Sequence, residues 1–588
     1  MLSRLFILAL IGFAACATPF MSFAQSVDMN RDKIALVMKA LSNPFFSRME
    51  AGAKEYADEN GIVLEVFGTE LETDVEYQIS IIDNLITRNY GAIVIAPVDS
   101  HKLIPSVKKA IDRGITVINI DNPLDQKTLA QQGLNIPFVG SDNAKGAALV
   151  GHYLRRQMQG KGRVIIIEGI RGVENADRRK AGFTKAITTG GGIEIVDSVS
   201  ANWHTEDAFT QMTELLEKHG AVDAVFCAND QMALGVLQAL DSHAQTAPIL
   251  IAGYDNIEAA RNELRNGRMH ATVEQHPELM GRYGIALAHE AMQGRPIPAY
   301  QETPLDLITH DSFGKRIALA VSEMANPFFT ALFKGAQTHA GLHGVELLHS
   351  DAKNDDAQQL VAIQNFIGQK VDFLIVNPTN SQAVQPGIEM AHSAQIPVIT
   401  VDRKEDSGQV LSHIASDNIA GGQLAAEYLI RQLPKGGAIV EFEGIPGTSA
   451  SYERGKGFND RIAQHDNLKI VKREVAYFSR DEARIIMQRL LAANQTTFDA
   501  IFAHNDNMIL GVLDALQAAH VVQRPLLIGF DAIPEARQAI TENKLSATIA
   551  QNPRLMGVLA VDTAVKALRG EKVATFIPVE LELIKSSQ

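Results

Sequence analysis

The chain has 588 residues, of which 46% are hydrophobic and 21% charged, a composition typical of a soluble globular protein with several domains. Its 54 Lys and Arg against 68 Asp and Glu give a formal net charge of −14. This balance argues against a nucleic-acid partner, because phosphate binding requires clustered basic side chains.

Residues 1–24 have the pattern of a cleaved secretory signal peptide. Arg4 supplies a positive n-region, Leu5 to Ala17 form an apolar stretch, and Ser22-Phe23-Ala24 offers a cleavage site. A membrane anchor is one alternative, but about 13 apolar residues fall short of the roughly 20 that a spanning helix needs. Lipidation at Cys16 is another, although a bulky aromatic three residues earlier makes a poor lipoprotein signal. We expect secretion and removal of this segment, which leaves Cys227 as the one cysteine and excludes an intramolecular disulfide.

One phrase occurs twice in the chain and divides it into two copies. IALVMKALSNPFFSRMEAGAK contains Asn43-Pro44-Phe45-Phe46, and IALAVSEMANPFFTALFKGAQ contains Asn326-Pro327-Phe328-Phe329. A repeat of nearly half the chain indicates a tandem domain rather than a solenoid. We predict a first domain over residues 33–305, a linker over 306–314 and a second domain over 315–588.

Within each copy, short apolar runs alternate with longer amphipathic stretches. In the second copy the runs are IALAV, VELLHS, FLIVNP, PVITVD, AIVEFEG, AIFAHND and LLIGFD. Such runs suit strands buried on both faces of a parallel sheet, and the segments between them have helical spacing. The alternation predicts an α/β fold built from right-handed βαβ units.

Almost every predicted strand of the second copy ends in a polar residue. Asn377, the pair Asp402-Arg403, the pair Asn505-Asp506, and Asp531 each follow an apolar run. Ligands bind at the carboxyl edge of open parallel sheets, so these ends predict one convergent polar pocket. A single Asp or Asn there is more often a turn or helix cap, and Asp506 and its counterpart Asp230 are interpreted as caps.

The residue types at this edge favour a sugar ligand. The polar members are Asn326, Asn377, Asp402, Arg403, Arg454, Asn505, Asp531 and Gln551, and the aromatic members are Phe328, Phe329 and Phe478. Planar carboxylate, amide and guanidinium groups can each bridge two neighbouring hydroxyls. The apolar faces of a sugar ring pack on aromatic side chains.

Residues 315–585 closely resemble the bacterial ribose-binding members of the type I periplasmic binding protein family. The resemblance runs through NPFF, VNPT, VITVDR, SHIASDN, GIPGTSASYERGKGF, AHNDNM, IGFD and ATIAQNP. It implies two doubly wound parallel-sheet lobes per copy, joined by hinge strands. It also implies a ribose site formed by Ser322, Asn326, Phe328, Phe329, Asn377, Asp402, Arg403, Arg454, Phe478, Asn505, Asp531 and Gln551.

The first copy matches the same family but differs in its pocket. By the resemblance its ligand-binding residues are Asn43, Phe45, Phe46, Asp121, Asn122, Arg179, Trp203, Asn229, Asp255 and Gln275. Met38 stands at the position of Ser322, Ala96 at that of Asn377, and Asn122 at that of Arg403, while Lys39 replaces Glu323. We expect this copy to bind a different sugar or polyol; a decayed or purely structural copy is the alternative.

The resemblance implies closure of two lobes over a sugar and docking of the closed form on the permease of an ABC importer. The crossings between lobes are expected near Gly140-Ser141, Glu274-Gln275 and Pro304, and near Ala415-Ser416, Ala550-Gln551 and Pro578. The alternative function is sugar sensing through a chemoreceptor or sensor kinase. No nucleophile–base pair, metal-ligand cluster or Gly-rich phosphate loop stands out, so we expect neither an enzyme nor a cofactor.

Overall fold

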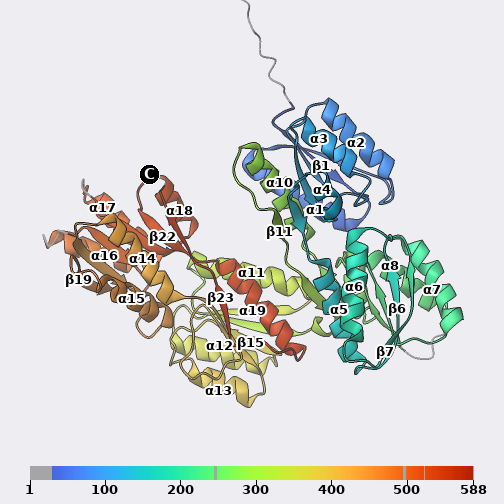
Figure 1. Ribbon diagram of the computed structural model, residues 1–588. Helices are drawn as coiled ribbons and strands as arrows, with labels where there is room; N and C mark the ends of the chain where they lie inside the picture. Colours follow the sequence, from blue (N-terminus) through green and yellow to red (C-terminus); the bar gives the residue numbers. More distant parts are fainter. Residues whose placement is uncertain (1–29, 244–247, 494–497, 522–523, 587–588) are drawn as a thin grey trace, which may run out of the picture. The chain divides into compact units, whose positions relative to one another are not determined.

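The computed structural model describes residues 30–243, 248–493, 498–521 and 524–586 (Figure 1). The predicted signal peptide therefore lies outside the described residues. The chain forms two compact units, one of residues up to Leu215 with Glu274–Asp306, and one of Leu216–Val273 with Leu307 onwards. The two halves of the repeat are described in turn below.

Two six-stranded sheets belong to the first half of the chain. One has the order β11 (Tyr300–Glu302), β5 (Phe138–Gly140), β4 (Thr116–Ile120), β3 (Ala92–Ile95), β1 (Lys33–Met38), β2 (Val63–Gly68). The other has the order β12 (Asp306–Thr309), β10 (Ala271–Glu274), β9 (Leu250–Ala252), β8 (Ala224–Cys227), β6 (Gly162–Glu168), β7 (Ile193–Ser200).

The helices of the first half alternate with these strands. They are α1 (Pro44–Asn60), α2 (Val75–Thr87), α3 (Ile104–Asp112), α4 (Gln126–Gln131), α5 (Asn143–Gln157), α6 (Glu174–Thr188), α7 (Thr205–His219), α8 (Asp230–Asp241), α9 (Glu258–Arg265) and α10 (Pro277–Met292). A short 3-10 helix, His310–Ser312, follows β12.

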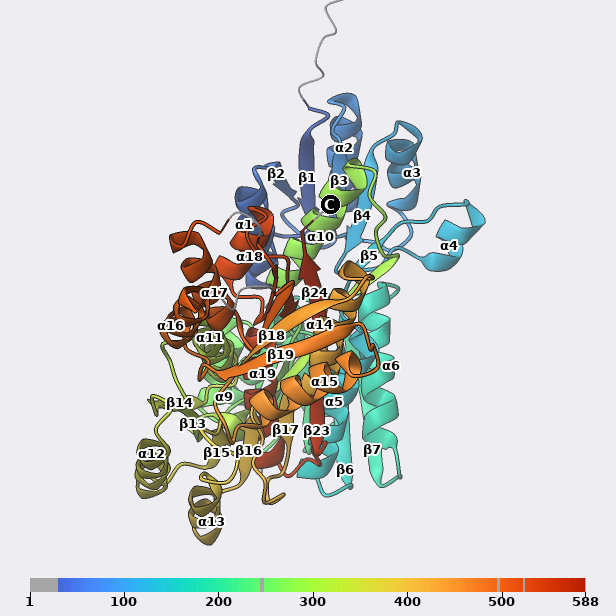
Figure 2. The same cartoon turned by 90° about the vertical axis from the view of Figure 1, so that its left-hand side faces the viewer.

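The second half repeats this arrangement, and each of its sheets defines one lobe. The sheet of the first lobe has the order β14 (Glu346–Asp351), β13 (Arg316–Val321), β15 (Phe373–Val376), β16 (Val398–Val401), β17 (His413–Ser416), β23 (Phe576–Val579). The sheet of the second lobe has the order β19 (Leu468–Val475), β18 (Gly437–Glu443), β20 (Ala500–Ala503), β21 (Leu526–Asp531), β22 (Ala547–Ala550), β24 (Glu582–Lys585). Figure 2 shows β18 beside β19, and β15, β16 and β17 side by side.

The helices of the second half divide between its two lobes. The first lobe contains α11 (Pro327–Leu342), α12 (Asp356–Gly368), α13 (Gln385–Ser393) and α19 (Pro553–Leu568). The second contains α14 (Asn418–Gln432), α15 (Ser449–Ile462), α16 (Arg480–Ala492), α17 (Asp506–Ala518) and α18 (Pro534–Thr541).

Alternate residues of the central strands enter different cores, which explains their unbroken apolar sequence. In β13, Ile317 and Leu319 pack with α11 and α19, whereas Ala318 and Ala320 pack with α12 and α13. Successive side chains of a strand point to opposite faces, so a sheet covered by helices on both faces needs apolar residues at every position. The predicted α/β fold of doubly wound lobes is confirmed.

Strand β24 departs from the parallel arrangement expected from sequence. β24 pairs with β22 antiparallel. The chain leaves β23 in the sheet of the first lobe and reaches β24 after only two residues, with no crossover helix. A parallel neighbour would need a long crossover connection, so this short connection enters the second sheet in the opposite direction.

Each half crosses between its two sheets three times. In the second half the crossings follow Ser416 at the end of β17, Ala550 at the end of β22 and Val579 at the end of β23. In the first half they follow Gly140 in β5, Glu274 in β10 and Glu302 in β11. These positions lie within two residues of those that the family resemblance implies.

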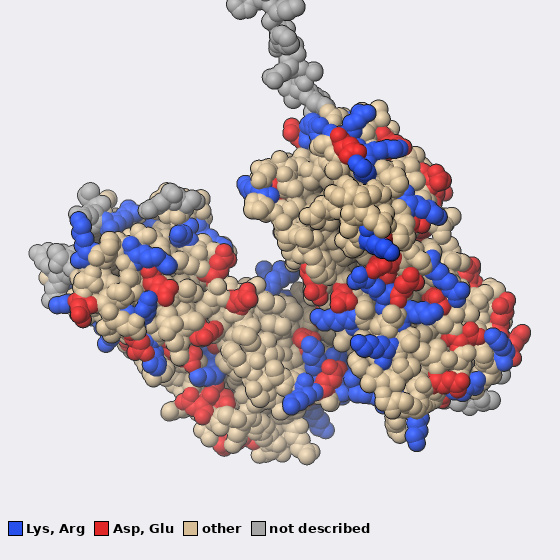
Figure 3. Space-filling view, in the orientation of Figure 1, with Lys and Arg blue, Asp and Glu red and all other residues tan. Residues whose placement is uncertain are grey.

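The described residues contain no helix that is both long and apolar enough to cross a membrane. Basic and acidic side chains are interspersed over both units on the face shown in Figure 3. This is the pattern of an ordinary solvated surface.

Candidate functional site

The repeated Asn-Pro-Phe-Phe turn starts helix α11 at the carboxyl end of β13. Asn326 is the N-cap, and its side-chain oxygen accepts a hydrogen bond from the Phe328 N–H at 3.0 Å. Pro327 occupies the first helical turn, where its missing N–H costs nothing. Because the cap uses the oxygen of Asn326, its side-chain NH2 is the group that can serve a ligand.

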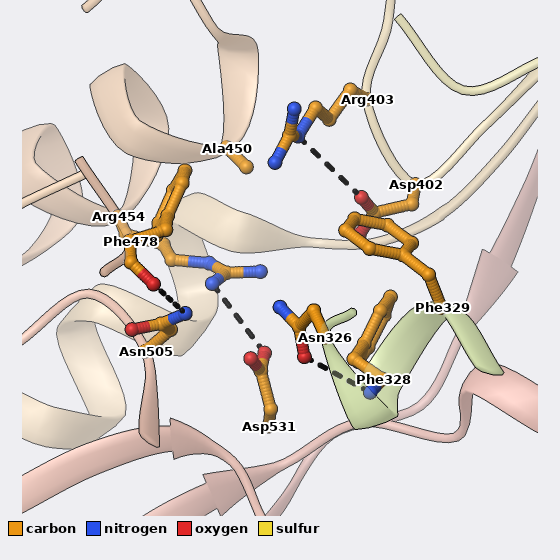
Figure 4. Close-up of a pocket in the computed structure, with 10 residues that line it drawn as sticks. All are labelled: Asn326, Phe328, Phe329, Asp402, Arg403, Ala450, Arg454, Phe478, Asn505 and Asp531. Carbon is orange, nitrogen blue, oxygen red and sulfur yellow. Dashed lines mark hydrogen bonds and ion pairs between the residues drawn. The ribbon is translucent and has the colours of Figure 1, made fainter. Parts of the chain in front are cut away.

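A small cavity lies at this turn, between the two lobes of the second half (Figure 4). The first lobe contributes Asn326, Phe328, Phe329, Asp402 and Arg403, and the second contributes Ala450, Arg454, Phe478, Asn505 and Asp531. All ten are buried. Side chains from both lobes therefore surround one small polar cavity, which is the closed arrangement.

Two guanidinium groups lie at the cavity, each over an aromatic ring. The Arg403 guanidinium lies 5.4 Å from the ring centroid of Phe329 in the first lobe and 5.4 Å from that of Phe478 in the second. The Arg454 guanidinium lies 3.9 Å from the ring centroid of Phe530. Cations are attracted to the faces of aromatic rings, so Arg403 contacts both lobes through this interaction.

The cavity carries two carboxylates opposite these cations. Arg454 Nη1 lies 3.5 Å from Asp531 Oδ1, and Arg403 Nε lies 3.9 Å from Asp402 Oδ2. Burial raises the pKa of Asp402, although the neighbouring Arg403 opposes this shift. Burial likewise raises the pKa of Asp531 to about 7. The four charges balance, and they point into a space that excludes bulk water.

Three predicted ligand residues lie behind the cavity wall and hold its lining residues. The Ser322 hydroxyl donates to Asn377 Oδ1 at 2.5 Å, and Asn377 Nδ2 donates to Asp402 Oδ2 at 3.1 Å. Gln551 Nε2 donates to Asp531 Oδ1 at 2.8 Å. Asn377 and Gln551 therefore contact the two carboxylates and Ser322 contacts Asn377, and none of the three is among the residues that line the cavity.

The interpretation of Asp506 and Asp230 as helix caps is wrong. The N-cap of α17 is Asn505, whose oxygen accepts from the Met508 N–H, and the N-cap of α8 is Asn229. Asp506 is fully buried, and it accepts from the Thr548 hydroxyl at 2.7 Å and the Ile533 N–H at 2.9 Å. It joins α17 to β22 and to the loop after β21. Asn and Asp can both cap a helix, so sequence alone does not show which residue of each Asn-Asp pair is the N-cap and which is buried against neighbouring elements.

Sequence reasoning also missed Ala450, which lines the cavity. A small apolar side chain in the first turn of α15 gives no chemical signal of its own. Its position becomes visible only when both lobes are in place.

In the corresponding region of the first half, a different residue supplies the buried positive charge. Lys39 Nζ lies 3.1 Å from Asp121 Oδ2, and both side chains are buried. The same ammonium lies 5.5 Å from the ring centroid of Phe46, the counterpart of Phe329. Lys39, at the end of β1, thus provides the cation that the second half takes from Arg403, after β16.

The other changes in the first half fit together as a set. The expected equivalence of Met38 with Ser322 is wrong: β1 ends at Met38 and β13 at Val321, so Met38 corresponds to Val321 and Lys39 to Ser322. Lys39 and Ala96 are both buried, and together they replace the Ser322–Asn377 hydrogen-bonded pair. Replacing only one member would leave a buried polar group without its partner, at a cost of about 1–3 kcal/mol. The joint change avoids that cost.

Asn122 keeps one backbone contact that Arg403 makes, with a shorter side chain. Asn122 Nδ2 donates to the Pro97 carbonyl at 3.1 Å, and Arg403 Nη1 donates to the Pro378 carbonyl at 3.2 Å. Asn122 Oδ1 also accepts from the Asn175 N–H of α6 at 3.4 Å. Asn122 is fully buried, and these two hydrogen bonds link the end of β4 to the loop after β3 and to α6 of the other lobe.

The remaining predicted residues of the first half are all buried. Arg179 Nε donates to Asn143 Oδ1 at 2.7 Å, and its guanidinium lies 5.6 Å from the Trp203 ring centroid. Gln275 Oε1 accepts from the Ser141 hydroxyl at 2.6 Å. Asn43 caps α1 as Asn326 caps α11, with Phe45 and Phe46 packed edge to face behind it. Asn229 and Asp255 belong to the other compact unit.

Several matched residues of the two halves share an unusual backbone conformation. Asp121 and Asp402 both have φ of 63°, and Asp255 and Asp531 have φ of 106° and 108°. Trp203 and Phe478 also have positive φ, at 70° and 58°. Non-glycine residues rarely adopt this region, and such strain gathers at binding sites. The first half retains it at three site positions, which argues that its pocket is maintained.

Comparison with known proteins gives a family match for both halves. Residues 34–296 and 317–572 each match the Periplasmic binding protein domain family. The ribose import binding protein RbsB of Escherichia coli is 42% identical over 268 residues, covering 46% of this chain and 90% of that protein. A D-ribose/D-allose-binding protein of Pseudomonas aeruginosa is 38% identical over 311 residues, covering 52% of this chain and 97% of that protein.

Among solved structures, similarity extends to an ABC transporter solute-binding protein of Actinobacillus succinogenes with bound D-allose. It is 35% identical with a TM-score of 0.46, over 47% of this chain and 98% of that one. The Caulobacter myo-inositol binding protein is 32% identical with a TM-score of 0.45, over 46% of this chain and 94% of that one.

Proposed function

Since this chain belongs to the periplasmic binding protein family, we propose that its two halves are separate sugar-binding units. The second half binds ribose or a very similar pentose, and the first binds a related sugar or polyol. Both deliver their ligands in the periplasm to the permease of an ABC importer. The family is one of solute-binding proteins, and the chain is not an enzyme.

The observation that carries the proposal is the two-lobe cavity of the second half. Its lining joins two carboxylates, two guanidinium groups and three Phe rings, drawn from both lobes. Sugar hydroxyls can donate to Asp402 and Asp531 and accept from Arg403 and Arg454, while the rings cover the apolar faces of the sugar. Because these partners come from both lobes, the ligand gains contacts on closure, and this differential affinity drives closure.

A different sugar in the first half is supported by the cation on its Phe ring. An ammonium is a point charge with three donors, whereas a guanidinium is a planar fork that matches two neighbouring acceptors. The use of Lys39 as the cation in place of Arg403, with Ala96 in place of Asn377, changes which hydroxyls can be bridged. A sugar or polyol with different hydroxyl geometry fits this altered donor set.

The proposal is tested by a matched pair of substitutions at the equivalent Arg residues. Arg454→Ala should abolish ribose binding, measured by calorimetry on the full mature chain, because it leaves Asp531 buried without its cation. Arg179→Ala should leave ribose binding unchanged, because Arg179 belongs to the other half. Unchanged ribose affinity in Arg454→Ala would overturn the site assignment.

A further inference from the structure

Two buried histidines lie together at the C-terminal end of α11, away from the residues that line the sugar cavity. His339 is in the last turn, and His343 is the C-cap residue. Residues four apart lie on one face of a helix. Their side chains are nearly inaccessible, with relative exposures of 4% and 1%. Their Nε2 atoms are 3.2 Å apart, with ring centroids at 4.7 Å and ring planes at 67°.

A carboxylate from the neighbouring helix completes the cluster. Asp562 is in α19, which packs against α11. Gly335 and Gly557 permit the close helix contact, since a Cβ on either would lie 2.0 Å from a backbone oxygen of the other helix. One ligand atom from each of His339, His343 and Asp562 lies within 4.8 Å of the others.

The spacing of the imidazole nitrogens matches the edge of a tetrahedral metal site. Zn–N bonds of about 2.0–2.1 Å place neighbouring nitrogens of a tetrahedral ion about 3.3–3.4 Å apart. Two imidazoles and a carboxylate form a donor set that suits zinc and similar transition metals better than magnesium or calcium. We propose that His339, His343 and Asp562 bind a divalent transition-metal ion of the zinc type.

The local contacts show what such an ion would compete with. Lys566 Nζ lies 2.6 Å from Asp562 Oδ2, four residues further along α19. The Lys566 side chain is 45% exposed, so it can turn into water when a cation reaches the carboxylate. Three protein ligands leave the fourth position of a tetrahedral ion to water or to another group of the protein.

The backbone around His343 indicates a structural role for the metal. The His343 carbonyl accepts from the Ser312 hydroxyl of the linker at 2.7 Å. The two preceding carbonyls, of Gly341 and Leu342, accept from the Arg261 guanidinium of α9 at 2.6 and 3.1 Å. The end of α11 is thus the point where the linker and α9 attach to the second half. Binding metal there ties this attachment point to α19.

The test uses the full mature chain without a polyhistidine tag, stripped with a chelator and titrated with Co²⁺ and then Zn²⁺. One Co²⁺ per chain should bind with the visible absorption of a tetrahedral site, and Zn²⁺ should displace it and raise the unfolding temperature. Absence of stoichiometric binding by the wild-type chain would overturn the proposal, and that measurement needs no variant.

Substitution then locates the site. His339→Gln, His343→Gln and Asp562→Asn should each weaken Zn²⁺ binding more than about 100-fold, because loss of a direct ligand exceeds the effect of an outer-shell change. His392→Gln is the matched control, since His392 is an exposed histidine near the end of α13 in the same lobe. Circular dichroism confirms that each variant is folded. Unchanged metal binding in both His339→Gln and His343→Gln would contradict the assignment.

Discussion

The pocket of the second half and its counterpart in the first begin with the same Asn-Pro-Phe-Phe turn but obtain their positive charge from different strand ends. In the second half the cation is Arg403, which follows Asp402 after β16. In the first half it is Lys39, at the end of β1, paired with Asp121. A pocket can therefore keep its charge balance while changing the shape of its donor. Specificity can diverge between tandem copies without loss of the buried carboxylate that requires a cation.

The largest expected effect comes from removing Lys39, the residue that supplies the first half with the cation that Arg403 supplies in the second. Lys39→Met leaves Asp121 as an unpaired buried charge, and we expect it to lower the free energy of unfolding by about 3–5 kcal/mol. Urea unfolding measures this change. Lys33→Met is the control, because the Lys33–Glu65 pair is a quarter exposed and is worth at most about 1 kcal/mol. Equal, small effects of the two substitutions would show that Lys39 does not neutralise Asp121.

The second prediction concerns the hydrogen-bonded pair that the first half lacks. Asn377→Ala should cost about 1–3 kcal/mol and weaken ribose binding, because it removes the acceptor of the Ser322 hydroxyl and a hydrogen-bond donor to Asp402. Adding Ser322→Ala should cost less than the sum of the single changes, since the two side chains are hydrogen-bond partners and neither is then left buried without the other. Chemical denaturation of the four proteins gives the coupling energy. If the two losses of unfolding free energy simply add, Ser322 and Asn377 are not coupled, which contradicts the inference that both positions had to change together.

The third prediction is a pH dependence specific to the second half. The Asp531 pKa is raised from an ordinary value near 4 to about 7 by burial. Between these values the folded protein holds a proton that the unfolded chain has lost, so the free energy of unfolding falls as pH rises. Sugar hydroxyls donate to the ionised carboxylate, so ribose affinity should rise with pH and level off above about 7.

Calorimetry between about pH 5.5 and 8 checks this prediction. Below about pH 7, the affinity should fall by up to about tenfold per pH unit, with a proton released on binding. Titrations in two buffers of different ionisation enthalpy detect that proton. A flat profile without proton release would mean that Asp531 is already ionised in the free protein.

The smallest expected effect is a change in the fluorescence of Trp203. Trp203 is the one tryptophan of the chain, and it packs against Arg179 in the first half. Its fluorescence should respond to the ligand of the first half and stay unchanged on addition of ribose. A screen of sugars and polyols by this signal identifies the unknown ligand. A fluorescence change that follows ribose saturation would place ribose in the first half instead.

Much of this architecture was predictable because local sequence determines it. Strands buried on both faces must be apolar throughout, and Asn-Pro at a strand end starts a helix, so β13, α11 and the polar strand ends could be predicted from residues alone. The antiparallel strand β24 could not, because its direction depends on a crossing between two sheets.

The residue types of the site were predictable from sequence. Which of these residues line the cavity and which lie behind its wall was not. Ser322, Asn377 and Gln551 have the same polar character as the lining residues, and only the fold separates the cavity wall from the groups behind it. The role of Lys39 depends on the ends of β1 and β4 meeting across β3, which are far apart in sequence. The cluster of His339, His343 and Asp562 was not predicted, because Asp562 joins the two histidines only through the packing of α19 on α11.

The most direct test of two different pockets is a calorimetric titration of the mature chain with D-ribose. Our account predicts saturation at one ribose per chain, bound in the second half. Two ribose molecules per chain would contradict it, because the changes at Lys39, Ala96 and Asn122 would then leave specificity unaltered.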